Sequence, residues 1–229
     1  MTVVIGDVHG CAAELEELLS RTGVAASRDR LLLTGDAFSR GPEPVRVWEL
    51  IGTLGAGMVL GNHDGRLLSQ LHQHETGSPV SFRRPHHRVT FEALLPRADQ
   101  ILPWLGGCPL HIQSTDGAGR PYLLIHAGIN PEKGLGGTSR DEFLTIRTWP
   151  PTGGLDGPRW YDHLEPSAGQ TIFGHDAPLG LVTRHRVGDE GGRPWLLGLD
   201  SGCVYGGSLS AYVVEEDRLV QVPSRQPAL

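Results

Sequence analysis

The chain has 229 residues, of which 38% are hydrophobic, and a formal net charge of −6. This length admits one sizeable α/β domain or two small ones, and the acidic balance argues against a general nucleic-acid-binding protein, which usually carries a basic surplus. No stretch is long and apolar enough to span a membrane, and the three cysteines lack the spacing of a metal or redox motif, so we expect free thiols and a cytoplasmic location.

The N-terminal part of the chain predicts alternating strands and helices. Short apolar runs at residues 1–5, 31–34 and 58–60 are typical of buried strands. Apolar side chains recur at helical spacing over residues 11–19, and again from Pro44 onward. This β-α-β-α start favours parallel strands joined by right-handed crossovers, and therefore an α/β fold.

Residues 72–90 interrupt this pattern. The segment contains four histidines and three arginines together with proline and glycine, and it lacks clear periodicity. We therefore expect an exposed loop or lid, inserted into a single domain that spans residues 1–229.

The second half of the chain is predicted to be rich in strands. Apolar runs bounded by glycine and proline indicate strands at residues 110–113, 121–125, 171–173, 179–182, 195–199, 209–214 and 219–222. Helices are predicted over residues 91–105, with an interruption at a proline, and over residues 139–146.

Five short motifs follow apolar runs, and each offers Asp, Asn or His at the end of a predicted strand. They are GDVHG at 6–10, GDAFSRG at 35–41, GNHD at 61–64, HAG at 126–128 and GHD at 174–176. One such motif is often only a turn or a helix cap, but five of them indicate a ligand site, because open α/β sheets bind ligands at that edge. The candidate ligands form a mixed nitrogen and oxygen set that suits manganese, iron or zinc: Asp7, His9, Asp36, Asn62, His126 and His175.

In these motifs and their order, the chain resembles the calcineurin-like metallophosphoesterases, and within them the phosphoprotein phosphatase family. The stretch LGLDSGCVYGGSLSAYVVE at residues 197–215 is similar to the branch that contains bacterial protein phosphatases and symmetrical dinucleoside tetraphosphatases. The resemblance implies a sandwich of two mixed β-sheets flanked by helices.

The resemblance also implies two divalent metal ions, which we expect to be manganese, with iron or zinc as alternatives. In such a site two cations clamp a phosphoryl group and share a hydroxide that attacks phosphorus in line. The ligands implied for one ion are Asp7, His9 and Asp36, and those implied for the other are Asp36, Asn62, His126 and His175, with Asp36 as the bridge.

Substrate contacts and an acid catalyst follow from the same resemblance. Arginine would bind phosphate oxygens as a planar fork, and a histidine would protonate the leaving oxygen. The implied acid is His63, and the implied phosphate contacts are Arg40, Asn62 and Arg147, where Arg140 and Arg159 are alternatives to Arg147.

The sequence departs from the family at one position. The usual motif is GDxxDRG, whose second Asp orients and charges the catalytic histidine, and Ser39 stands in its place here. A serine hydroxyl does not stabilise an imidazolium as a carboxylate does, so a phosphate leaving group suits this chain better than an alkoxide. Asp64 is a candidate to compensate, and Asp200 is a candidate supporting or structural residue.

We therefore expect a metal-dependent phosphohydrolase that acts on dinucleoside polyphosphates, which are phosphorylated small molecules. A serine/threonine protein phosphatase with a phosphoprotein substrate is the alternative. A non-catalytic metal-binding scaffold of the same fold is the alternative from another class, and the set of six ligands argues against it. We expect neither a membrane nor a nucleic acid as a partner.

Overall fold

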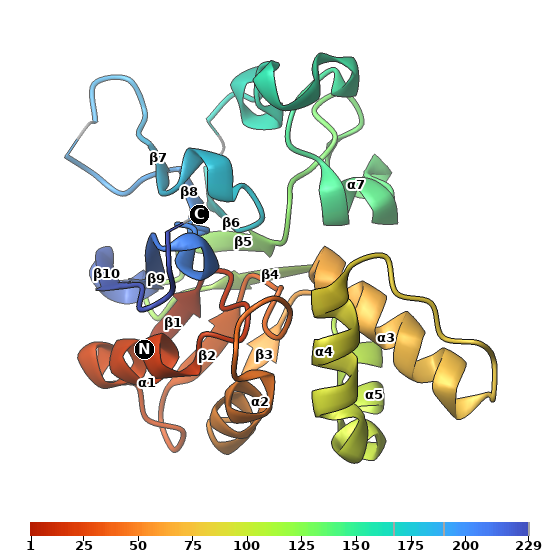
Figure 1. The fold of residues 1–229 in the computed structure, drawn as a ribbon. Helices are drawn as coiled ribbons and strands as arrows, with labels where there is room; N and C mark the ends of the chain where they lie inside the picture. Colours follow the sequence, from red (N-terminus) through yellow and green to blue (C-terminus); the bar gives the residue numbers. More distant parts are fainter. Residues whose placement is uncertain (167, 190, 229) are drawn as a thin grey trace.

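The computed structural model describes residues 1–166, 168–189 and 191–228, and in it two five-stranded β-sheets lie face to face (Figure 1). The strands of the first sheet are β1 (Thr2–Ile5), β2 (Arg30–Leu33), β3 (Gly57–Met58), β9 (Ser208–Val213) and β10 (Arg218–Pro223). Their order is β10-β9-β1-β2-β3. β1, β2 and β3 are parallel, whereas β9 runs antiparallel to both of its neighbours.

The second sheet has the order β4-β5-β6-β8-β7 and consists of β4 (His111–Thr115), β5 (Pro121–Ile125), β6 (Gln170–Phe173), β7 (Val182–Arg184) and β8 (Leu196–Gly198). The three central strands are parallel, and β4 and β7 are antiparallel edge strands. Both sheets are therefore mixed, and the predicted sandwich of two mixed β-sheets flanked by helices is confirmed.

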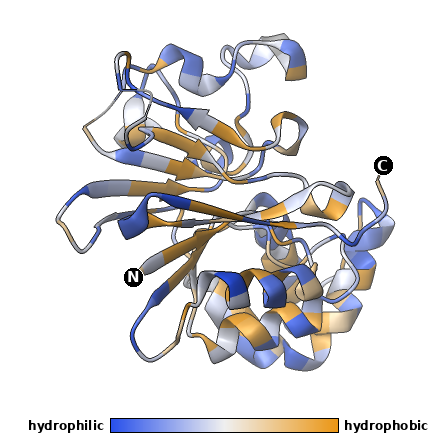
Figure 2. Ribbon diagram, turned by 90° about the vertical axis from the view of Figure 1, so that its left-hand side faces the viewer, coloured by the Kyte–Doolittle hydropathy of each residue, from blue (hydrophilic) through white to orange (hydrophobic). Residues whose placement is uncertain are grey.

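The facing surfaces of the two sheets are apolar, which is why the sheets stack. Val4 and Leu32 of the first sheet share one buried cluster with Leu124 and Ile172 of the second. Figure 2 shows hydrophobic residues on the strands where the two layers meet. Burial of such faces stabilises the fold by about 25 cal/mol per Å² of apolar surface, so this cluster fixes the position of one sheet on the other.

Five of the described helices pack into one core with the outer face of the first sheet (Figure 1). They are α1 (Ala12–Thr22), α2 (Pro44–Thr53), α3 (Asn62–Glu75), α4 (Pro85–Leu94) and α5 (Ala98–Gly106). In α1, for example, Leu15 and Leu18 are fully buried at helical spacing. They pack in the same cluster as Val3 and Ile5, which point from β1 to the face opposite Val4.

Shorter elements lie on the other side of the second sheet. They include α6 (Gly134–Gly137) and α7 (Arg140–Thr145). Ser139 caps the N-terminus of α7 and forms a capping box with Glu142. Phe143 of α7 packs with Ile125 and Phe173 of the sheet. Turns of 3₁₀-helix occur at Leu95–Arg97, Pro151–Asp156, Trp160–His163, Ala177–Leu179, Cys203–Tyr205 and Val214–Glu216.

The predicted β-α-β-α start is confirmed, and most predicted strands lie within two residues of observed ones. Two strand predictions need correction. The strand expected at residues 58–60 is β3, which ends already at Met58. The strand expected at residues 179–182 begins only at Val182, because Leu179 belongs to a 3₁₀ turn. The proline interruption predicted within residues 91–105 is confirmed by the turn between α4 and α5.

The prediction of a loop over residues 72–90 is wrong at both ends. α3, which the sequence analysis did not identify, continues to Glu75, and α4 begins at Pro85, so only residues 76–84 connect them. Both helices bury polar side chains, among them Gln70, His87 and Thr90, so their buried sides produce little hydrophobic periodicity. Pro85 at the first helical position is the sequence signal that marks the start of α4.

No helix in the described ranges has both the length and the apolar character needed to cross a membrane. Cys11, Cys108 and Cys203 are free thiols, as expected. Cys11 and Cys203 are buried in the core beneath the first sheet, where they serve as small packing residues.

Candidate metal centre

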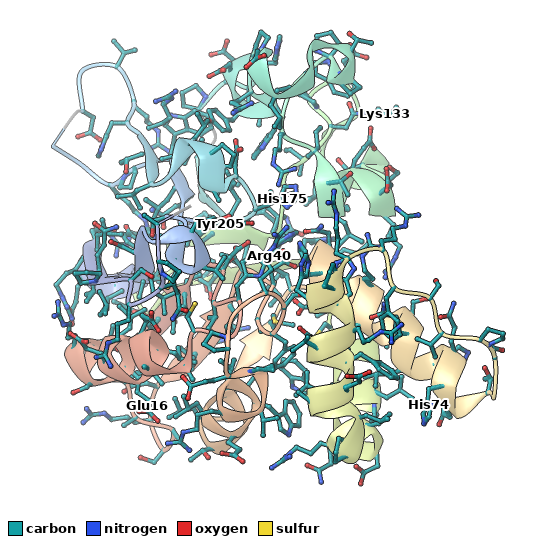
Figure 3. All side chains as sticks on the ribbon, viewed as in Figure 1. Glu16, Arg40, His74, Lys133, His175 and Tyr205 are labelled. Carbon is teal, nitrogen blue, oxygen red and sulfur yellow. The ribbon has the colours of Figure 1, made fainter. Side chains whose placement is uncertain are left out.

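The six predicted ligands all lie beyond the carboxyl ends of parallel strands, where the two sheets meet. Figure 3 labels Arg40, His175 and Tyr205, and the three lie together at this junction in the middle of the molecule. The first sheet contributes four of the six side chains and the second sheet contributes two. In chain order, Asp7 and His9 follow β1, Asp36 follows β2, Asn62 starts α3 beyond β3, His126 follows β5 and His175 follows β6.

Asp36 lies between two groups of side chains that could each hold a metal ion. Asp7, His9 and Asp36 form the first group, and Asp36, His126 and His175 form the second, with the ligand atoms of each group within 4.8 Å of one another. The Oδ2 atom of Asp36 is 3.8 Å from Nε2 of His9 and 3.6 Å from Nε2 of His126. One carboxylate oxygen therefore faces both groups, as a bridging ligand must.

Hydrogen bonds hold the two carboxylates in this orientation. Oδ1 of Asp36 accepts a bond from the backbone N–H of His63 at 2.8 Å, which leaves Oδ2 toward the histidines. Asp7 accepts bonds from the hydroxyl of Thr34 at 2.9 Å and from the backbone N–H of His175 at 3.1 Å. Such outer partners fix the ligand atoms before an ion binds.

The second group presents lone pairs that converge. Nδ1 of His126 lies 2.8 Å from the carbonyl oxygen of Thr34 and donates its proton there. Burial lowers the pKa of His126 to about 4, so the ring is neutral near pH 7 and Nε2 carries a lone pair. That lone pair faces Oδ1 of Asn62 at 3.1 Å and Oδ2 of Asp36 at 3.6 Å. A divalent cation would satisfy all three atoms, so the residues present fit the metal that the donor set suggests.

Buried negative charge at the centre supports the same conclusion. Burial raises the pKa of Asp36 to about 7, and the nearby Asp200 raises it as well. Burial and Asp200 together raise the pKa of Asp7 well above its usual range. Burial also raises the pKa of Asp200 itself, to about 6. Buried carboxylates that repel one another are stabilised in their charged form by a bound cation.

Backbone strain is concentrated at the same place. His9, Asp36, Arg40 and His175 have φ angles of 48°, 51°, 80° and 69°. Left-handed backbone is unfavourable for residues with a Cβ, by roughly 1 kcal/mol or more each. Among the described residues, Asp217 is the one other non-glycine residue with such a φ. Surrounding structure therefore holds the site in a conformation that the local sequence does not favour.

Glycines allow the backbone to approach the ligand carboxylates closely. A Cβ added at Gly174 would collide with Oδ1 of Asp7, and a Cβ added at Gly61 would collide with Oδ1 of Asp36. The glycines of the GHD and GNHD motifs are thus part of the geometry of the centre, because they leave room for the two carboxylates.

His63 has no carboxylate partner among the described residues. Its Nε2 lies 3.2 Å from Nη2 of Arg40, and its buried Nδ1 has no hydrogen-bond partner among the described residues. Ser39 is buried but forms no side-chain hydrogen bond with the ring. The Asp64 carboxylate instead accepts a bond from the backbone N–H of Ala37 at 3.2 Å. The compensating role considered for Asp64 is therefore not what the structure shows.

Arg147, rather than either alternative, reaches the centre. It lines the cavity of about 560 Å³ above the two groups, and its Nη2 donates to the carbonyl oxygen of His175 at 2.9 Å. Arg159 is buried and forms an ion pair with Asp176 at 3.0 Å. Arg140 is exposed at the start of α7 and does not line the cavity.

Asp200 and Tyr205 are among the other residues that line this cavity. Asp200 follows the apolar strand β8. It therefore fits the same sequence pattern as Asp7 and Asp36, an Asp at the end of an apolar strand. Tyr205 lies with its ring 5.4 Å from Cζ of Arg40. Tyr205 has no signal in the sequence as a site residue, because the glycines around it in SGCVYGG indicate only an irregular turn.

Comparisons with known proteins agree with this geometry. The sequence profile of the calcineurin-like phosphoesterase family matches residues 2–207. A symmetrical bis(5'-nucleosyl)-tetraphosphatase of Edwardsiella ictaluri (strain 93-146) is 31% identical, over 98% of this chain and 96% of that protein. One of Pectobacterium carotovorum subsp. carotovorum (strain PC1) is 36% identical over a shorter alignment, with 57% of this chain and 44% of that protein.

A solved structure described as a candidate diadenosine tetraphosphatase has the same fold. It superposes with a TM-score of 0.75 at 30% sequence identity, and the match covers 97% of this chain and 93% of that one. The profile match spans all five ligand motifs. From its strand-end ligands, its two mixed sheets and these comparisons, the chain belongs to the calcineurin-like phosphoesterase family.

Proposed function

We propose that this phosphoesterase holds two divalent metal ions and hydrolyses phosphoanhydride bonds of dinucleoside polyphosphates. The observation that carries the proposal is the position of Asp36 Oδ2 between the Nε2 atoms of His9 and His126. The mixed donor set supports manganese, with iron or zinc as alternatives. The residues that would hold the first ion are Asp7, His9 and Asp36, and those for the second are Asp36, Asn62, His126 and His175.

When bound, the two ions would neutralise charge on the phosphoryl oxygens and activate water as the nucleophile. The side chains of the cavity position the substrate. Arg40 and Arg147 would bind the non-bridging oxygens of the reacting phosphate as planar forks, and Asn62 lies beside them. In its protonated form, His63 would supply the proton to the leaving oxygen.

The unpartnered Nδ1 of His63 supports a particular class of leaving group. Without a carboxylate on Nδ1, the protonated form of the ring is poorly stabilised. A nucleoside diphosphate leaves with its charge spread over phosphate oxygens, and so needs little protonation. The serine alkoxide of a phosphoprotein is far more basic. The geometry therefore supports a dinucleoside polyphosphate over a phosphoprotein as substrate.

The names of the relatives specify symmetrical cleavage. With diadenosine tetraphosphate, water would attack one of the two central phosphorus atoms, and the P–O bond to the central bridging oxygen would break. The leaving half takes the bridging oxygen and a proton, so the products are two molecules of ADP. We further infer that residues 1–229 form one domain and that the protein works in the cytoplasm, where its free thiols stay reduced.

The test compares substrates and products with a controlled metal supply. Protein stripped by a chelator is expected to be inactive, and Mn²⁺ is expected to restore hydrolysis of diadenosine tetraphosphate to ADP alone. A phosphoserine peptide is expected to react much more slowly. Asp36→Asn is expected to lose both activity and metal, measured by elemental analysis. Full activity of the stripped protein would disprove the metal mechanism, and release of AMP with ATP would disprove symmetrical cleavage.

A further inference from the structure

A second cavity adjoins the metal centre on the side of α3 and α4. Its volume is about 730 Å³, and it shares Arg40, Asn62 and His63 with the cavity above the metal-binding groups. Arg66 of α3 and residues 83–87, at the start of α4, form the rest of its lining. Figure 1 shows α4 beside α3, at the end of the loop that joins them. We call this cavity the basic pocket.

Arginines give the basic pocket a charge that nothing in the described chain neutralises. Arg66, Arg83 and Arg84 line it together with Arg40, and no carboxylate of a described residue does so. The side chains of Arg66, Arg83 and Arg84 form no ion pair or hydrogen bond with the described residues, whereas many arginines elsewhere are paired with carboxylates. Unpaired guanidinium groups that converge on one cavity favour a multiply charged anion.

Three histidine rings of the same pocket have unused hydrogen-bonding capacity. Nδ1 of His63, Nε2 of His86 and Nδ1 of His87 are buried, and none has a hydrogen-bond partner among the described residues. The three rings offer ligand atoms within 4.8 Å of one another, and His87 is only 6% exposed. Buried polar atoms without partners indicate a ligand. The guanidinium groups beside them would repel a cation, so an anion is the favoured occupant.

We propose that the basic pocket binds the phosphates of the leaving nucleoside diphosphate. This inference rests on the proposed function, because only a polyphosphate substrate has a leaving half that carries such charge. Arginine forks and imidazole N–H groups are donors suited to phosphate oxygens, and the N-terminal end of α4 adds a positive dipole at the same place. Because His63 belongs to both cavities, the polyphosphate chain runs from the metal centre past His63 into the pocket.

The pocket would therefore determine which phosphates the enzyme prefers. A single aryl phosphate fills only the metal centre, whereas a tetraphosphate places its leaving half among the arginines. Loss of those arginines is then expected to reduce selectivity for polyphosphates more than it reduces chemistry at the reacting phosphorus.

The test measures binding and selectivity in the manganese-loaded protein. The double variant Arg83→Gln/Arg84→Gln changes exposed side chains, so its melting temperature should stay near that of the wild type. By calorimetry, the ratio of ADP affinity to orthophosphate affinity is expected to fall at least tenfold, as for the loss of charged hydrogen bonds. The ratio of kcat/KM for diadenosine tetraphosphate to that for p-nitrophenyl phosphate is expected to fall by a similar factor. Arg88→Gln, an exposed arginine of α4 outside the pocket, is the matched control and should change neither ratio.

The two readouts separate this inference from the proposed function. If the protein does not hydrolyse diadenosine tetraphosphate, the proposed function fails, but the ADP affinities still test the pocket. Unchanged ADP selectivity in the double variant would overturn the inference. A third metal ion that is bound by the wild type and lost in His86→Gln/His87→Gln would also overturn it, because the pocket would then be a cation site.

Discussion

Arg40 combines an unfavourable backbone angle with a functional side chain. Its φ of 80° is easy for glycine and costly for other residues. Both Arg40→Ala and Arg40→Gly are expected to lose about 2–4 kcal/mol of transition-state stabilisation, the scale of a lost oxyanion contact. Arg40→Gly is expected to be more stable than Arg40→Ala by roughly 1 kcal/mol. Kinetics with an aryl phosphate and urea unfolding measure the two effects, and equal stability of the variants would contradict the strain argument.

Ser39 permits a direct test of the acid catalyst. In Ser39→Asp, a carboxylate near His63 is expected to stabilise the protonated ring, which helps most where the leaving group is basic. The ratio of kcat/KM for a phosphoserine peptide to that for diadenosine tetraphosphate should rise about tenfold or more. Ser39→Asn serves as the control, because an asparagine side chain has the size of an aspartate side chain but no charge. If the ratio stays constant while the metal content is intact, His63 does not protonate the leaving group.

For single residues, the sequence predicts which candidate ligands lie together better than it predicts the other contacts around them. Asp7, Asp36 and His126 could be identified because each follows an apolar strand, and the same rule extends to Asp200. The ring of Tyr205 beside Arg40 could not be predicted, since it depends on how the turn after β8 folds onto the centre. The left-handed φ angles likewise have no local signal, because the surrounding fold imposes them.

Among the elements, the turn after β6 depends on a glycine. Gly174→Ala is expected to displace Asp7, because the added Cβ would collide with its carboxylate. We expect reduced metal content and at least a tenfold loss of activity, the scale reported for outer-shell damage at metal sites. Elemental analysis and kinetics measure both. Gly52→Ala in α2 is the control, since its Cβ meets open space, and it should leave both quantities unchanged. Normal metal content in Gly174→Ala would show that the turn adapts.

Strands of this fold are easier to predict than the helices beside the site. β5 is an apolar run that is mostly buried in the sandwich, and β9 is buried along most of its length with only two serines among its residues, so both patterns appear in the sequence. α3 and α4 are different because they bury polar residues such as Asp64 and His87 near the centre. Their helical state is determined by packing against each other and against neighbouring helices, which hydrophobic periodicity does not record.

Across the whole molecule, a network of charges connects the edges of the two sheets. Asp116, in the turn between β4 and β5, accepts hydrogen bonds from Arg120 at 2.6 Å and from Arg193 at 2.8 Å. Arg120 also donates to Asp217, in the turn between β9 and β10, at 3.0 Å. The network therefore joins the second sheet to the first on the side away from the helices α2 to α5 (Figure 1).

This network predicts a pH dependence of stability. Burial alone would raise the pKa of Asp116, but hydrogen bonds from the backbone of Arg120 and from both arginine side chains outweigh it and hold the pKa well below its usual range. A lowered folded-state pKa stabilises the fold above about pH 4, and the contribution is lost as pH falls toward that pKa. Asp116→Asn is expected to reduce the free energy of unfolding by about 2 kcal/mol at pH 7.

The measurement is urea unfolding of both proteins at pH 7 and at pH 2.5. The difference in the free energy of unfolding between wild type and Asp116→Asn should be smaller at the lower pH. The reason is that the wild-type carboxylate begins to be protonated there and then stabilises the fold less. Asp141→Asn, at an exposed position of α7, controls for the loss of one negative charge. A difference that does not change with pH would show that the charge of Asp116 contributes nothing.

The division of the centre between the sheets makes its two halves unequal. Asp7, His9 and Asp36 come from one sheet, so they move together when one sheet shifts relative to the other. His126 and His175 come from the other sheet, so the same shift changes their distances to Asp36. Of two bound ions, the one held by Asp7, His9 and Asp36 would then depend only on the local order of the first sheet. Binding of the other ion would depend on how the two sheets are aligned. A change that shifts one sheet relative to the other would therefore release the ion held by His126 and His175. The ion held by Asp7, His9 and Asp36 would stay bound, and the chain would stay folded.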